Sequence, residues 1–205
     1  MDPVLQPLGG ILSLNTDLVL NSVADLSEAD ALRRPVPNGN NVRFLLAHLV
    51  AARHFVAELL GKPLANPHEE AFRAVETVEH AESLPELSAL RREWSRISPH
   101  VVSCLERATA DVLTSSAPQP LPGSDGTVLG AITFLVQHES YHLGQLGLLR
   151  IALGYPGVSY DPAPGRSSPW RPSSSTPSPS GPEDSWEPWP GAGSAGSCTG
   201  RCRWR

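Results

Sequence analysis

Two histidines, His138 and His142, stand four residues apart within the longest uninterrupted helical pattern of the chain, residues 127–153. Apolar residues such as Ile132 and Leu149 recur there at steps of three and four, so that they share one face with both histidines. The i, i+4 spacing places both imidazoles one turn apart, where they can reach a single point. A divalent metal ion would give both nitrogens a partner where water is scarce. The alternative is a pair of hydrogen-bonded core histidines.

The same five residues, HESYH, also match H-E-x-x-H, the motif with which zinc metalloproteases carry two histidine ligands and a glutamate base. The longer form of that motif requires glycine and histidine where this chain has Gln145 and Leu148. A glutamate ligand further along would have to be Glu183 or Glu187, which lie in a low-complexity segment. We therefore reject the metalloprotease interpretation.

The sequence allows more than one role for three residues next to the histidine pair. Glu139 lies about 100° round the helix from His138, where it would touch a metal-bound water, bond a ligand imidazole, pair with another helix or face solvent. Tyr141 and Gln145 would either line a pocket and orient a ligand histidine, or serve in packing and hydrogen bonding between helices.

The elements that position the pair are predicted to be helices throughout, because no segment shows sustained strand alternation. Capping residues, glycines and prolines bound the segments, with Thr127 or Ser124 and Asn40 or Asn41 as N-caps and a capping box from Ser83 to Glu86. We predict an all-α four-helix bundle with a long connection, 61–82, between its second and third helices. The predicted long helices are residues 4–25, 40–60, 83–108 and 127–153, with a short helix at 28–34.

Facing helices of a bundle build sites in its core, and the second helix carries His48 in the middle of its apolar face. His48 is therefore predicted to meet His138 and His142. His54 lies about 240° round from His48 and is interpreted as a surface histidine. His68 and His80 are expected to face solvent.

The chain resembles the DinB/YfiT-like family of metal-binding four-helix bundles over roughly residues 5–160. The resemblance rests on NNVRFLLAHLVAARHFVAELLG at 40–61, HESYHLGQLGLLR at 138–150 and the closing ALGYPG. It implies a metal-binding triad formed by His48, His138 and His142. The expected cofactor is a divalent ion, zinc or nickel, since three imidazoles leave such an ion open positions.

The resemblance also implies a chemistry, because characterised relatives include transferases and isomerases that use low-molecular-weight thiols. The leading hypothesis is a metal-dependent thiol S-transferase acting on a small-molecule substrate, with the thiol as co-substrate. A hydrolase that uses metal-bound hydroxide and a non-catalytic metal- or ligand-binding bundle are the alternatives.

The composition limits which binding partners and which cellular compartment are expected for the protein. The net charge is −5, and no basic cluster marks the first 160 residues, so a nucleic-acid groove is not expected. No apolar run approaches the roughly 20 residues that span a bilayer, and no signal peptide is recognised. Three cysteines form no disulfide framework, which favours the cytoplasm. Pairing into a homodimer is a further expectation from the relatives.

The composition changes at about Asp161. Residues 161–205 contain nine of the 21 prolines and four of the five tryptophans but no Leu, Ile, Val, Phe or Met. Such a segment cannot build a core, so we predict a bundle domain over residues 1–160 and a disordered tail over 161–205. Its codon-biased composition suggests a shifted reading frame or an acquired extension. Cys198 and Cys202 are too few to indicate a metal site.

Overall fold

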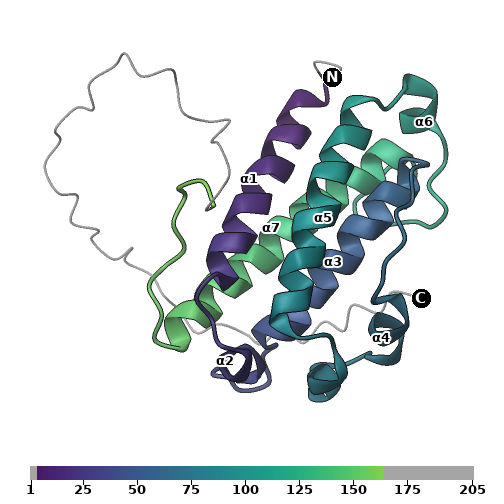
Figure 1. The fold of residues 1–205 in the computed structure, drawn as a ribbon. Coiled ribbons are helices and arrows are strands. Elements are labelled where there is room, and N and C mark those ends of the chain that lie inside the picture. The colour runs from purple at the N-terminus through teal and green to yellow at the C-terminus, as the bar shows by residue number, and fades with distance from the viewer. Residues whose placement is uncertain (1–3, 164–205) are drawn as a thin grey trace, which may run out of the picture. The chain divides into compact units, whose positions relative to one another are not determined.

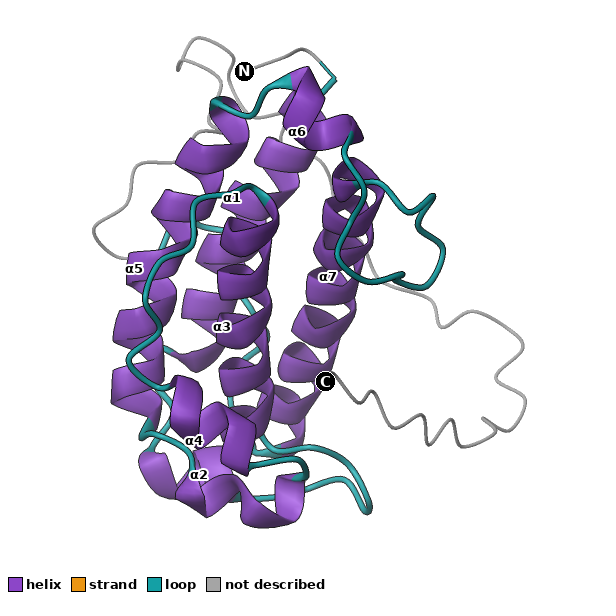
Figure 2. Ribbon diagram, turned by 90° about the vertical axis from the view of Figure 1, so that its right-hand side faces the viewer, coloured by secondary structure: helices purple, strands orange, loops and turns teal. Residues whose placement is uncertain are grey.

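The computed structural model describes residues 4–163, which fold as helices joined by loops (Figure 1). No strand occurs among these residues, apart from an isolated bridge between Ser116 and Thr127; Figure 2 shows the same helices from the side. The predicted all-α class is therefore confirmed. The helices are α1 Gln6–Val23, α2 Glu28–Leu32, α3 Val42–Leu59, α4 Glu69–Ala74, the 3₁₀ helix η1 Val78–Ser83, α5 Leu87–Glu106, α6 Ala110–Thr114 and α7 Val128–Ala152.

The four long helices α1, α3, α5 and α7 form a bundle in which each packs against two others. The packed pairs are α1 with α5 and α7, and α3 with α5 and α7. In Figure 1, α1 and α7 run in one direction, and α3 and α5 run in the other. The chain must therefore return the length of the bundle between α3 and α5, which explains the long connection that the sequence predicted.

Side-chain caps mark where α3 and α7 begin. The Asn41 side chain accepts a hydrogen bond from the Phe44 amide at 2.8 Å, and Thr127 accepts one from the Gly130 amide at 3.0 Å. The predicted capping box at Ser83 is wrong, because Ser83 ends η1 and α5 begins at Leu87. The carboxylate of Glu28 on α2 accepts from the Leu87 amide instead, and this contact between distant residues cannot be read from local spacing.

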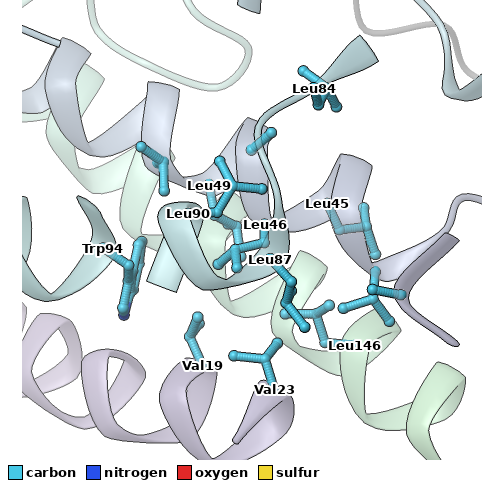
Figure 3. Packing of buried hydrophobic residues seen from close by; sticks show 14 of the residues in the cluster. Val19, Val23, Leu45, Leu46, Leu49, Leu84, Leu87, Leu90, Trp94 and Leu146 are labelled. Carbon is cyan, nitrogen blue, oxygen red and sulfur yellow. The ribbon is translucent and has the colours of Figure 1, made fainter. Parts of the chain in front are cut away.

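The buried apolar residues form two clusters along the bundle. The first lies near α2 and includes Val23, Leu46, Trp94 and Leu146; Figure 3 shows its packing. The second includes Leu113 of α6, together with Leu12, Ile97 and Ile132. We call them the α2-side and α6-side clusters. Each fully buried side chain of this kind stabilises the fold by about 1.5–3 kcal/mol, so the two clusters supply most of the driving force.

Polar side chains separate the two clusters. Between the apolar positions of α1 lie Asn15 and Thr16, both buried. The α3 segment between the clusters contains Arg53, and the α7 segment contains the histidine pair and Glu139. Buried polar groups destabilise a core unless they are paired, so this polar layer is where a functional arrangement is expected.

The chain beyond α7 returns along α1. Gly154, with φ of 90°, ends the helix in a conformation that favours glycine. Asn21 on α1 then donates to the carbonyls of Ser159 and Asp161, at 2.9 and 2.8 Å, and Ala163 is buried. The predicted disordered tail lies, from Pro164 onward, outside the described residues, as do Cys198 and Cys202.

Candidate metal centre

The three histidines singled out in the sequence come together in the polar layer. The Nε2 atom of His138 lies 3.1 Å from Nε2 of His48 and 2.9 Å from Nε2 of His142. One nitrogen from each of the three rings falls within 4.8 Å of the other two, a grouping that could hold a metal ion. His138 and His142 are buried and His48 is half-buried. The bundle therefore brings His48 of α3 to His138 and His142 of α7, as the sequence predicted.

The three imidazoles are neutral at pH 7. Burial, reinforced by the neighbouring histidines, lowers the pKa of His48 from 6.5 to about 3. Burial and His142 lower the pKa of His138 to about 4. Burial also lowers the pKa of His142, against an opposing hydrogen bond to Gln145. Each neutral ring therefore carries one nitrogen lone pair, which is the form that metal ligands require.

The contacts around the triad indicate which ring nitrogens carry a proton and which direct a lone pair toward the centre. The Nδ1 atom of His142 faces the Gln145 amide oxygen at 2.7 Å, so this nitrogen donates and Nε2 carries the lone pair. His138 Nε2 then faces two nitrogens, His48 Nε2 and His142 Nε2, while it can carry only one proton. One proton cannot make two good hydrogen bonds, whereas one divalent ion satisfies all three nitrogens. The donor set of three imidazoles suits zinc or nickel.

A sequence model of the DinB superfamily matches residues 11–146 of the 205, including all three histidines. The chain belongs to the DinB superfamily. Searches of curated proteins and of solved structures gave no match. The resemblance to DinB-like proteins is thereby confirmed, and within this DinB domain the remaining predicted residues can now be placed.

Gln145 and Tyr141 of the DinB domain form a chain of contacts that leads from His142 toward solvent. The Gln145 amide donates to the Tyr141 hydroxyl at 3.3 Å, while its oxygen holds His142. The Tyr141 ring lies 5.2 Å from that of His142 and is 57% exposed. Gln145 thus fixes the tautomer of His142, as outer hydrogen bonds do in metal sites, and Tyr141 marks the side of the site that reaches solvent.

Glu139 pairs with a neighbouring helix, one of the roles left open by the sequence. Its two carboxylate oxygens accept from Arg53 Nε at 2.5 Å and from Nη2 at 2.7 Å. Both side chains are buried, and Arg53 also donates to the Leu12 carbonyl at 2.9 Å and lies 4.6 Å from the Trp94 ring centre. Glu139 is thus bound on both oxygens, unlike a glutamate poised as a general base.

The prediction that His54 is a surface histidine is wrong. Its side chain is only 10% exposed, with Nδ1 2.9 Å from the Leu64 carbonyl and Nε2 2.8 Å from the Glu93 carboxylate. The connection between α3 and α5 covers it, which an angular position on one helix cannot reveal. His80 is exposed as predicted, whereas His68 is half-buried beside Phe72.

Sequence reasoning missed Arg53, which reaches each of the other three long helices through Glu139, Leu12 and Trp94. A signal was present, since Arg53 stands among apolar residues in the α3 pattern. A buried arginine requires an anionic partner, and the only carboxylate on α7 is Glu139.

Proposed function

We propose that this DinB-superfamily chain is a metal-dependent thiol S-transferase that joins a low-molecular-weight thiol to a small electrophile. The observation that carries the proposal is the convergence of three neutral imidazoles beside a glutamate that is already paired. Such a site can hold a divalent ion, zinc or nickel, through His48, His138 and His142. It offers the ion no neighbouring carboxylate base on α7, because Glu139 is bound to Arg53.

The choice of a thiol over water follows from the proton that must be lost. A divalent ion bound there would supply the Lewis acidity that ionises a thiol ligand near neutral pH. A thiol has a pKa of about 8.5, against about 15.7 for water. A bound ion therefore has to lower the pKa of a thiol far less than that of water to ionise it near pH 7. The sulfur then forms a bond to an electrophilic carbon, the leaving group departs with its electron pair, and the thiol proton passes to solvent.

The chain's own residues hold and orient the site. The imidazoles stay unprotonated because they are buried, and Gln145 keeps the Nε2 lone pair of His142 directed at the centre. Tyr141 lies at the exposed side, where a thiol or electrophile would enter. The hydrolase alternative would need its proton acceptor elsewhere, and a non-catalytic bundle would use the same histidines for binding alone.

The proposal places the reaction in the cytoplasm, where small thiols stay reduced. No described helix is both long and apolar enough to cross a bilayer. The proposed partners are small molecules rather than nucleic acid, and pairing of two copies of the chain remains a prediction.

The test incubates zinc- or nickel-loaded protein with a panel of small thiols and chlorodinitrobenzene, whose thioether product absorbs light. We expect a thiol-dependent rate that His48→Ala abolishes and that His80→Ala, an exposed histidine on η1, leaves unchanged. A rate no higher than that of His48→Ala would contradict the proposal. Turnover of esters without thiol would instead favour the hydrolase.

A further inference from the structure

A single side chain of α3, Arg53, contacts each of the other three long helices. Its Nε and Nη2 atoms donate to the two carboxylate oxygens of Glu139 on α7, at 2.5 and 2.7 Å. Nη2 also donates to the Leu12 carbonyl of α1 at 2.9 Å, and the guanidinium lies 4.6 Å from the centre of the Trp94 ring of α5. Trp94 is itself bound to α1, because its Nε1 donates to the Thr16 carbonyl at 3.2 Å. The contacts of Arg53 therefore connect all four long helices.

The Arg53–Glu139 pair lies close to the histidines along both helices that carry them. Arg53 follows His48 by five residues, which is about 7.5 Å along the axis of α3. On α7, Glu139 directly follows His138 and precedes His142 by three residues. A helix changes little in shape over one or two turns, since consecutive turns are hydrogen-bonded to each other. A bond that fixes Arg53 against Glu139 therefore also fixes His48 relative to the two histidines of α7.

A second polar contact holds the same stretch of α7 against α1. Asn15, which is 3% exposed, donates from Nδ2 to the Ser140 hydroxyl at 3.0 Å, and Ser140 lies between His138 and His142 in the sequence. Ser140 donates in turn to the Val136 carbonyl, one turn earlier on α7, at 3.1 Å. Polar contacts thus hold the histidine segment against both α3 and α1, whereas the clusters on either side of the polar layer are apolar.

Apolar packing alone defines the position of one helix along another only loosely. The hydrophobic effect has no preferred direction, whereas two parallel N–H···O bonds between a guanidinium and a carboxylate form in one geometry. A metal site needs its ligands held within about 0.5 Å of their working positions. Stability alone does not account for the pair, since apolar residues of similar volume can often replace a buried ion pair without loss of stability. The Arg53–Glu139 pair supplies the directional contact that the two apolar clusters lack.

We propose that Arg53 and Glu139 are positioning residues, which hold α3 and α7 in the register that lets His48, His138 and His142 bind one divalent ion. This role depends on the metal site of the proposed function but not on its reaction. It gives the pair an effect on metal affinity that is separate from its effect on stability. Replacing both partners should therefore weaken metal binding even where the fold keeps its stability.

The double variant Arg53→Met/Glu139→Leu separates the two effects, because apolar side chains of similar size replace both charges at once. Urea unfolding of the metal-free protein should give a midpoint close to that of wild type. The dissociation constant for zinc, measured by competition with a chromogenic chelator, should rise by about 10- to 100-fold. The visible absorption of bound cobalt(II), which depends on coordination geometry, should differ from that of wild type. A double variant that folds and binds zinc with wild-type affinity would overturn the proposal.

Arg53→Lys decides the question if the double variant does not fold. Lysine keeps a cation opposite Glu139 but lacks the planar fork that bonds both carboxylate oxygens. Zinc affinity should fall by roughly tenfold in this variant, and wild-type affinity would overturn the proposal. The matched control is Asp25→Leu/Arg150→Met, which removes another ion pair of α7, one that does not involve α3. It should keep wild-type zinc affinity, and a loss as large as that of the Arg53 variants would refute a specific role for Arg53 and Glu139.

Metal affinity and turnover separate the positioning role from the function on which it depends. Absence of metal from wild type would refute the metal site and, with it, both proposals. Zinc binding that weakens in the double variant, without thiol transfer by wild type, would refute the transferase and retain the positioning role. Thiol transfer by wild type together with unchanged zinc affinity in the double variant would retain the transferase and refute the positioning role.

Discussion

Arg53 on α3 donates to both carboxylate oxygens of Glu139 on α7, and Glu139 directly follows the ligand candidate His138. The pair therefore joins, within the polar layer, the same two helices that bring the three histidines together. Arg53 is fully buried and Glu139 is 3% exposed. Because water cannot replace either partner, the pair acts as a fixed link between the two halves of the site.

Removal of one partner of this pair should destabilise the bundle. We expect Glu139→Ala to lower the free energy of unfolding by about 3–5 kcal/mol, since it leaves the Arg53 guanidinium buried without its anion. Urea unfolding followed by circular dichroism measures the change. Glu69→Ala breaks the exposed pair with Arg73 and serves as the control, with no measurable loss expected. A loss for Glu139→Ala as small as that of the control would contradict the structure.

The metal-free protein should lose stability in acid. The pKa values of His48 and His138 fall from 6.5 in the unfolded chain to about 3 and about 4 in the folded one, so the unfolded state binds more protons below pH 6.5. Their contribution is complete above pH 6.5 and is lost progressively as the pH falls toward 4. Each histidine should contribute a slope of about 1.4 kcal/mol per pH unit in that range.

Unfolding of chelator-treated protein between pH 7 and pH 4 measures this slope. His48→Gln should flatten the profile, because glutamine does not titrate. The exposed His80→Gln serves as the matched control and should leave the slope as in wild type. Parallel profiles for wild type and His48→Gln would show that His48 titrates normally in the folded state.

Gln145 is predicted to raise metal affinity without binding the ion. Gln145→Leu removes the acceptor that holds the His142 Nδ1 proton, so we expect zinc affinity to fall by about 10- to 100-fold. Gln145→Glu keeps an acceptor at that position and should restore most of the affinity. Competition with a chromogenic chelator measures both variants. Wild-type affinity in Gln145→Leu would show that the hydrogen bond has no role in the site.

Truncation after Tyr160 is predicted to keep the bundle folded, because the predicted tail provides no core residues. The structure distinguishes two possible truncation points. A cut after Tyr160 removes the Asp161 carbonyl that accepts from Asn21 and the buried Ala163, whereas a cut after Ala163 retains both. We expect the shorter chain to melt slightly below the longer one. A large drop in Tm for the chain cut after Ala163 would show that residues 164–205 stabilise the bundle.

The histidine site could be predicted because its signals are local. His138 and His142 share a face by spacing alone, and the middle of the α3 apolar face contains His48. The N-caps of α3 and α7 were predictable for the same reason, since Asn41 and Thr127 bond amides three residues ahead. Short-range geometry of this kind depends little on the rest of the chain.

The residues that sequence analysis misplaced depend on contacts between distant segments. His54 is covered by the connection at Leu64 and by Glu93, and α5 is capped by Glu28, almost 60 residues earlier in the chain. Arg53 pairs with Glu139, which lies 86 residues later in the chain on α7. Which helices pack together, and in what register, had to be known before these partners could be assigned.

Metal content is the measurement that tests the central claim most directly. Protein purified without a histidine tag is analysed by elemental mass spectrometry, with His142→Ala as the variant and the exposed His80→Ala as the matched control. Our account predicts about one zinc or nickel ion per chain in wild type and in His80→Ala, and loss of the ion in His142→Ala. Absence of metal from all three proteins after incubation with divalent ions, or equal metal in all three, would contradict the account.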